Sequence, residues 1–315
     1  MGSAGTPTWL DKLEEQLNVD VDWMDPEHIK GMPIVPHDQT SNQLWVDIQL
    51  GDDSNRDLLL ETAKELKNEG WLAIYTRMAV LMCKKNIDSI RGRVLLQTLP
   101  SNAFRFQETL DHARLYDKEF ARAGIGRDRY CIKIPSTGPA LNAAKVLSSE
   151  GIPTLGTALF SLPQAIACSQ AGMLYISPYY NGNFITVQEA MAAGEMGCHS
   201  ATISHTVLNE LAKLPYVASE QPGPDVPKPA HVYKDAPPVS DRLRKLLSID
   251  PLAGPDWNGK LASTDVDYLA DGGAPLQNAI EADAVTKKRL ADAMALFTGG
   301  QERSRAKIEE VLPLV

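Results

Sequence analysis

The stretch Cys131–Thr137, CIKIPST, decides the fold, because it places one lysine between two isoleucines in what reads as a fully buried strand. A charged amine among apolar side chains is costly unless it is paired, neutral or used for chemistry. Successive side chains of a strand point to opposite faces, so Lys133 lies on one face and Ile132 and Ile134 lie on the other. In a barrel of parallel strands, the lysine would point inward and both isoleucines outward to a ring of helices.

Six further apolar runs accompany this one and alternate with helical patterns. The seven predicted strands cover residues 19–23, 32–38, 93–99, 130–136, 154–160, 174–180 and 200–204. The patterns between them carry helix signals, such as Pro139 in a first turn and Gly151 just past a last turn. This alternation predicts βα units and a parallel sheet, and the short, regular spacing favours a (β/α)8, TIM-barrel-like α/β fold over an open doubly wound sheet.

The chain divides into four parts by composition. We expect an N-terminal segment at 1–18, the α/β barrel at 19–215, a Pro-rich loop at 216–240 and a helical extension at 241–315, with a short helix at 240–249 and a long helical tail from about residue 282. The C-terminal helices are expected to pack on the barrel, and a homodimer contact is the alternative.

Composition excludes several classes of function. The formal net charge of −9 argues against a nucleic-acid or anionic-membrane surface, since both need a basic face. No apolar run approaches the length of a membrane span. The four cysteines are far apart and suggest neither a disulfide framework nor a metal site, which fits a reducing compartment and predicts a soluble cytoplasmic protein. His37, His199 and His205 have no metal-ligand spacing either, so no metal site is expected.

Lys133 is the strongest candidate for chemistry. A lysine between low-dielectric walls has a lowered pKa, so part of it is the neutral amine that attacks a carbonyl to form a Schiff base. Two structural interpretations stay open: the side chain snorkels at a strand end, or it forms an ion pair with Asp22. Strand parity places Asp22 with Asp20 on one face, and the hydroxyls of Thr157, Ser177 and Tyr179 could position a catalytic water or stabilise substrate oxygens.

Four motifs occur in an order and spacing that resemble the transaldolase family. They are CIKIPST, GIPTLGTALFSLPQA, AGMLYISPYYN and GCHSATISHTVLNELAKL, and the resemblance covers about residues 19–215. It implies a (β/α)8 barrel with Lys133 as the Schiff-base lysine and Asp22 as the acid/base partner. Thr157 and Ser177 match pocket residues of the family, and Asn42 matches an asparagine of a DATTNPS-like turn, although Gln43 replaces the proline that follows it.

Several positions depart from typical transaldolases. Gln97 stands in place of a glutamate that helps to activate the catalytic water, Tyr179 in place of a phenylalanine, and Leu155 in place of a pocket asparagine. These three changes resemble the fructose-6-phosphate aldolase branch of the family, in which a tyrosine and a glutamine hold the water. Gly182 and Asn183 stand where the family has a phosphate-binding arginine.

The seventh strand of the family is also missing from the sequence. Only about twenty residues separate Tyr180 from the run at 200–204, and a βα unit needs roughly 25–35. We therefore expect a barrel with one βα unit missing or replaced. Three explanations stay open: a gene model that lacks an exon, a variant in which the Pro-rich segment after Val217 covers the gap, or a family member without catalysis.

The resemblance implies transfer of a dihydroxyacetone unit between sugar phosphates in the pentose phosphate pathway, on a small carbonyl or sugar-phosphate substrate. No metal or organic cofactor is implied, because the lysine itself acts as the electron sink. The alternatives are an aldolase that acts on an unphosphorylated or unusual carbonyl substrate, and a catalytically impaired protein that serves as a binding or scaffold protein.

Overall fold

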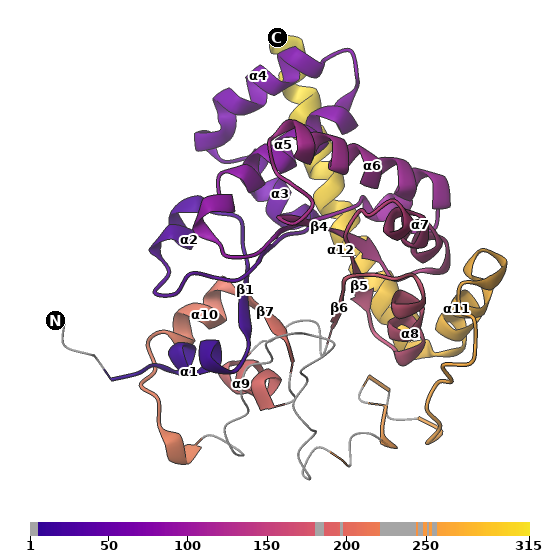
Figure 1. The fold of residues 1–315 in the computed structure, drawn as a ribbon. Helices are drawn as coiled ribbons and strands as arrows, with labels where there is room; N and C mark the ends of the chain where they lie inside the picture. Colours follow the sequence, from indigo (N-terminus) through magenta and orange to yellow (C-terminus); the bar gives the residue numbers. More distant parts are fainter. Residues whose placement is uncertain are drawn as a thin grey trace.

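A curled sheet of seven parallel strands organises the molecule (Figure 1). The computed structural model describes residues 6–179, 186–195, 198–220, 244, 248–250, 252–253 and 257–315. The strands are β1 (Asn18–Asp22), β2 (Gln39–Thr40), β3 (Val94–Gln97), β4 (Tyr130–Pro135), β5 (Thr154–Leu159), β6 (Tyr175–Pro178) and β7 (Ser200–Ser204). Their spatial order is β6-β5-β4-β3-β2-β1-β7, a half-barrel that confirms the predicted TIM-barrel-like α/β fold.

The sheet ends at β6 on one side and at β7 on the other. β7 pairs in parallel with β1, from Asn18 opposite Ser200 to Asp22 opposite Ser204, and no strand lies between β6 and β7 in the part of the chain that the structure describes. The helix α9 (Val187–Glu195) occupies the sequence between them. One βα unit of a closed barrel is therefore missing, as predicted. Gly182, Asn183, most of the Pro-rich segment and most of the helix expected at 240–249 lie outside the described residues.

β2 is much shorter than predicted and begins later. The strand expected at 32–38 is irregular, and the regular ladder starts only at Gln39. Pro33 and Pro36 explain the difference, because proline has no N–H to donate to a sheet. Isolated main-chain bonds replace the ladder there, from His37 N to Val19 O at 2.7 Å and from Gly92 N to His37 O at 2.6 Å.

Helices cover the outer face of the sheet (Figure 1). They are α1 (Trp9–Gln16), α2 (Pro26–Gly31), α3 (Gln43–Leu50), α4 (Arg56–Leu66), α5 (Trp71–Lys84), α6 (Phe106–Arg122), α7 (Gly138–Ser149), α8 (Leu162–Gln170), α9, α10 (His205–Leu211), α11 (Ala270–Ala282) and α12 (Ala284–Val311). The main core lies between sheet and helices and includes Ile132 and Ile134, both fully buried. The ring of Phe120 in α6 stacks on the ring of Tyr130 in β4, with the ring centroids 4.2 Å apart. The lysine's two neighbours thus point outward, as strand parity predicts.

Inside the curl, a second small apolar cluster confirms that parity. It consists of Leu95, Cys131 and Leu155, two residues before Gln97, Lys133 and Thr157 on their strands. Strict alternation along β5 predicts that Leu159 shares this face with Leu155 and Thr157, but this prediction is wrong, since Leu159 belongs to the outer core. The register between β5 and β6 shifts between Gly156 and Leu159, and Ala158 has a positive φ of 51°. Because of this bulge, the side chains after Thr157 point to the face opposite to the one that strict alternation predicts.

The long C-terminal helix α12 packs across α3 and α5. Gly300 permits the closest approach, because a Cβ at this position would lie 2.9 Å from the carbonyl carbon of Gln43. Two basic residues of α12 reach the buried Asp47 of α3: Arg303 Nε donates to Oδ2 at 2.7 Å and Lys307 Nζ to Oδ1 at 2.7 Å. The helix therefore belongs to the same packed unit as the early strands.

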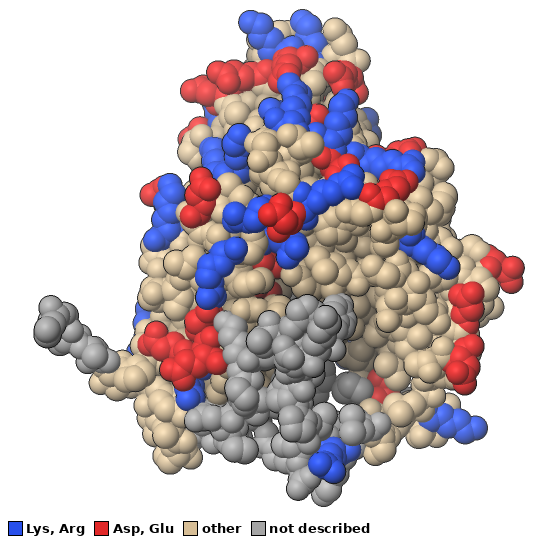
Figure 2. All heavy atoms as spheres, viewed as in Figure 1, with Lys and Arg blue, Asp and Glu red and all other residues tan. Residues whose placement is uncertain are grey.

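Acidic and basic side chains are interspersed over the helices on the face drawn in Figure 2. None of the helices in the described ranges combines the length and the apolar character that crossing a bilayer requires.

Candidate active site

A cavity of about 1340 Å³ opens within the curled sheet. Drug-sized ligands usually occupy pockets of about 300–1,000 Å³, so this space admits a sugar-sized molecule with room to spare. Five of the seven site residues expected from the sequence line the cavity: Asp22, Asn42, Lys133, Ser177 and Tyr179. The other two, Gln97 and Thr157, lie behind this lining and are almost completely buried.

Lys133 lies on β4 beside Gln97 of β3 and Leu155 of β5. Its side chain is only 5% exposed, and among the described residues its Nζ hydrogen-bonds only to the carbonyl oxygen of Ser41, at 3.0 Å. Burial lowers the pKa of the Lys133 amine, and the negative charge of Asp22 opposes this shift. Neither structural interpretation fits: the amine does not reach solvent at a strand end, and no carboxylate among the described residues hydrogen-bonds to it. A buried lysine with a lowered pKa has the properties of an amine nucleophile.

Asp22 ends β1 and faces the cavity with a carboxylate that two donors hold. Thr40 Oγ1 donates to Asp22 Oδ1 at 2.8 Å, and the indole Nε1 of Trp45 donates to the same oxygen at 2.9 Å. Trp45 packs edge-on against Trp23, with ring centroids 4.8 Å apart. The aspartate is thereby fixed in orientation, and its second oxygen is available to move a proton in the cavity.

Asn42 and Ser177 approach the cavity from different sides. Asn42 caps α3, because its Oδ1 accepts from Leu44 N at 2.9 Å. Its side-chain nitrogen, a donor, carries no hydrogen bond among the described residues. Ser177 lies on β6 at the edge of the sheet, between the exposed residues Ile176 and Pro178. Both side chains can offer a hydrogen bond to a ligand oxygen.

Gln97 lies on one side of the lysine strand, and Thr157 lies with Tyr179 on the other side. The hydroxyls of Thr157 and Tyr179 lie 3.3 Å apart, and burial raises the pKa of Tyr179 to about 12, so the phenol stays protonated. Gln97 is 1% exposed, yet neither its Nε2 nor its Oε1 has a partner among the described residues. A buried amide without protein partners is a ready site for a small polar molecule.

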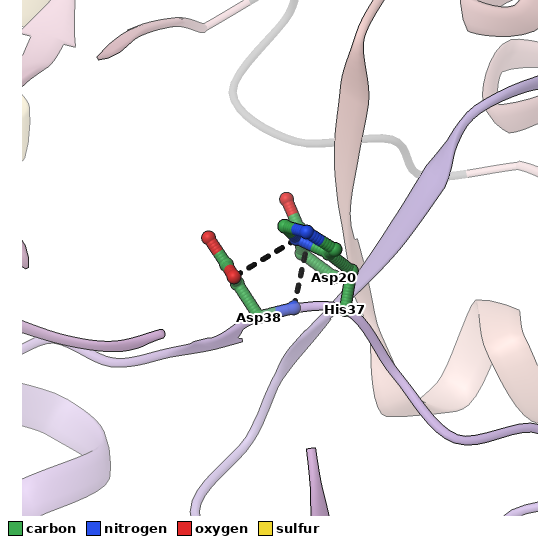
Figure 3. A group of neighbouring side chains, drawn as sticks. All are labelled: Asp20, His37 and Asp38. Carbon is green, nitrogen blue, oxygen red and sulfur yellow. Dashed lines mark hydrogen bonds and ion pairs between the residues drawn. The ribbon is translucent and has the colours of Figure 1, made fainter. Parts of the chain in front are cut away.

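A second polar cluster lies at the opposite, N-terminal end of the strands, where Asp20, His37 and Asp38 meet (Figure 3). His37 Nδ1 is 2.9 Å from Asp38 Oδ1 and 3.6 Å from Asp20 Oδ1. Burial raises the pKa of Asp20 to about 7. Contacts with Asp20, and then with Asp38, raise the pKa of His37 to about 9.

Sequence reasoning missed the groups that hold the site residues in place. Trp45 reads as ordinary packing, and the carbonyl of Ser41 carries no signal in a sequence. The grouping of Asp20 with His37 is invisible in their spacing, because it depends on the irregular segment that lies beside β1. Parallel strands bring their ends together, and this is the only signal that could have suggested the cluster.

A comparison with known protein families identifies the family of this chain. The family model described as transaldolase/fructose-6-phosphate aldolase matches residues 20–191, which is more than half of the chain. The match runs from within β1 to within α9 and includes all seven site residues expected from the sequence, but not β7, which adds Ser200, Ala201 and Thr202 to the cavity lining. The family carries out aldolase-type and transaldolase-type reactions, in agreement with the resemblance of the four sequence motifs. This chain belongs to the transaldolase/fructose-6-phosphate aldolase family.

Proposed function

We propose that the chain is a Schiff-base transaldolase that transfers a dihydroxyacetone unit between sugar phosphates, as in the pentose phosphate pathway. One observation carries this proposal: the buried amine of Lys133, with its lowered pKa, lines the same cavity as the fixed carboxylate of Asp22. A neutral amine beside a proton-transferring carboxylate is what carbon–carbon cleavage through an imine needs. Such sugar-phosphate chemistry fits the cytoplasmic location expected from the cysteines.

The reaction would begin with attack of Lys133 Nζ on the carbonyl carbon of a ketose. Loss of water leaves a protonated imine, which withdraws electrons from the adjacent carbon–carbon bond. Asp22 removes the proton of the hydroxyl group beyond that bond, the bond breaks, an aldehyde leaves and an enamine remains on Lys133. Attack of the enamine on a second aldehyde, followed by hydrolysis of the imine, releases the new ketose and the free lysine.

Arg289 supports a phosphorylated substrate. It lies on α12. Among the described residues, only Arg289 and Lys133 bring an arginine or lysine side chain to the cavity lining. A guanidinium group binds phosphate in a bidentate manner, so Arg289 would hold the phosphate end of a substrate whose carbonyl lies at Lys133. Asn42 and Ser177 would bind the hydroxyl groups between these ends.

The alternative is an aldolase that hydrolyses the enamine instead of passing it to an acceptor. The unpartnered amide of Gln97 and the Thr157–Tyr179 hydroxyl pair favour it, because together they could hold a water close to the lysine. That water would allow protonation of the enamine and release of free dihydroxyacetone. Apolar side chains such as Leu155 and Phe297 line other parts of the cavity and are compatible with a less polar substrate.

Borohydride trapping tests the common step of both reactions. The purified protein is incubated with fructose 6-phosphate, and separately with dihydroxyacetone, then reduced and mapped by mass spectrometry. We expect an adduct on Lys133 that is absent from Lys133→Met, with Lys145→Met on the exterior helix α7 as the matched control. A folded protein that neither donor labels would contradict the Schiff-base proposal and favour a binding or scaffold role.

A second assay distinguishes transfer from hydrolysis. The protein is given fructose 6-phosphate with and without erythrose 4-phosphate as acceptor, and free dihydroxyacetone is quantified. Product formation that depends on the acceptor supports the transaldolase, whereas steady release of dihydroxyacetone without acceptor supports the aldolase.

A further inference from the structure

The cluster of Asp20, His37 and Asp38 is built from two segments that meet at the N-terminal end of the sheet (Figure 3). One ligand atom from each of the three side chains lies within 4.8 Å of the others. Asp38 directly precedes β2 at the level of Arg93, and Lys133 lies at the level of Gln97, four residues further along β3. At about 3.3 Å per residue, roughly 13 Å of sheet separates the cluster from the lysine. The cluster is therefore a second position in the same cavity, away from the lysine.

Main-chain groups orient both carboxylates. Asp38 N donates to Asp20 Oδ1 at 3.1 Å, and Arg93 N donates to Asp38 Oδ1 at 2.7 Å. Gly92 makes room for this arrangement, since a Cβ there would lie 2.0 Å from Asp38 Oδ1. The carboxylates are thus held in place by backbone that the fold itself fixes.

One oxygen of each carboxylate is left for a ligand. Asp20 is 5% exposed and Asp38 is 3% exposed, but both side chains line the large cavity. All of their hydrogen bonds within the described ranges use Oδ1, so Oδ2 of each residue accepts none. Both Oδ2 atoms remain accessible from the cavity, so each can accept a bond from a ligand there.

Among the described residues, no lysine or arginine bonds to either of these oxygens. The guanidinium of Arg93 is engaged with Tyr175, whose hydroxyl lies 3.1 Å from Nη1. His37 contacts both acids through the same nitrogen, Nδ1. Two buried carboxylates and one imidazole that converge on a single point form a typical oxygen-and-nitrogen ligand set for a divalent cation.

We propose that Asp20, His37 and Asp38 bind one divalent transition-metal cation, of the class of Zn²⁺ or Mn²⁺, at the N-terminal end of the open barrel. Ligand atoms that share such an ion at about 2.1 Å lie roughly 3 to 3.5 Å apart, and one ligand atom of each of the three side chains already lies within 4.8 Å of the others. The remaining coordination positions would face the cavity. The ion would tie β1 to the segment before β2 and would stabilise the end of a sheet that does not close on itself. This inference does not depend on the Schiff-base function.

The test uses the full chain without an affinity tag, stripped with a chelator and titrated with Zn²⁺, and separately with Mn²⁺, by isothermal calorimetry. We expect one saturable site per chain, together with a midpoint of thermal unfolding that rises with the concentration of the metal. Borohydride labelling of Lys133 is measured in parallel and is expected to survive the chelator, so failure of the catalytic proposal would be recognised separately.

Two variants locate the site. His37→Lys keeps a positive charge between the two acids but removes the ligand nitrogen, and Asp20→Asn removes a charged ligand. Each is expected to weaken Zn²⁺ binding at least 100-fold, whereas the same lysine substitution at His28 on α2 leaves it unchanged. Circular dichroism establishes that each variant is folded. Absence of saturable binding to the wild-type chain, or undiminished binding in both folded variants, would overturn the proposal.

Discussion

The indole Nε1 of Trp45 donates a 2.9 Å hydrogen bond to the carboxylate of Asp22, and this bond joins the first turn of α3 to the end of β1. Thr40 Oγ1 supplies the second bond to the same oxygen. A charge-assisted bond contributes about 1.5–3 kcal/mol. The tryptophan is thus expected to hold the aspartate in the orientation that proton transfer requires.

Trp45→Phe should lower the turnover of fructose 6-phosphate by about 10-fold, because a loss of roughly 1.4 kcal/mol corresponds to that factor. Trapping of the Schiff base on Lys133 should persist, since the amine does not contact the indole. Steady-state kinetics and borohydride labelling measure the two effects. Trp71→Phe on α5 is the matched control, and equal turnover in both variants would count against the role of Trp45.

Asp22→Asn should separate formation of the imine from cleavage. The charge of Asp22 opposes the lowering of the Lys133 pKa, so its removal lets that pKa fall further, and the amine stays neutral down to a lower pH. Labelling of Lys133 should therefore extend to lower pH than in the wild type, while turnover falls by about 10²–10⁴-fold for want of the proton acceptor. The pH dependence of labelling is the measurement. A shift to higher pH would contradict the assigned electrostatics.

Tyr179→Phe should change how the enamine partitions. The substitution removes the hydroxyl that lies 3.3 Å from Thr157 Oγ1, and with it one of the groups that could hold a water near Lys133. Release of dihydroxyacetone in the absence of an acceptor should drop by about 10-fold, with transfer to an acceptor less affected. Tyr268→Phe, on the segment that precedes α11, is the control. Equal loss of both activities would indicate a general structural effect.

Arg289→Ala should discriminate between phosphorylated and free substrates. If the guanidinium binds phosphate, the KM for fructose 6-phosphate should rise by about 10- to 100-fold, while the KM for free fructose or dihydroxyacetone should change little. Lys288→Ala, its exposed neighbour paired with Asp292, is the control. A proportional change for both kinds of substrate would exclude Arg289 as the phosphate partner.

Gly300→Ala should destabilise the protein by about 1–3 kcal/mol, because the new methyl group would press on the backbone of Gln43 in α3. Gly299 is the matched control in the same helix. A Cβ there would meet only the flexible end of Arg303, at 3.4 Å, so Gly299→Ala should be neutral or stabilising through helix propensity. Chemical denaturation measures both. Equal effects at the two glycines would contradict the close crossing of α12 and α3.

Strand parity was the strongest guide from sequence, since it placed Lys133 inside the curl and its isoleucine neighbours outside. It failed at Leu159, where a bulge shifts the register, and the strand at 32–38 was wrong because its prolines cannot join a ladder. The bulge at Leu159 depends on backbone geometry that local composition does not encode, whereas Pro33 and Pro36 are visible in the sequence. The contacts made by Ser41 and Trp45 join distant segments, so they follow only from the folded chain.

The bonds between Asp47 and α12 also affect how the protein is made. Arg303 follows Asp47 by 256 residues, so a ribosome synthesises α3 long before its cationic partners exist. Until they dock, the buried carboxylate lacks the charges that offset its desolvation, and the early strands cannot reach their final stability. We therefore expect nascent chains to gain their full stability only after α12 has been synthesised. A chain that ends before residue 303 is therefore expected to be less stable than the full chain, because Asp47 then lacks both cationic partners.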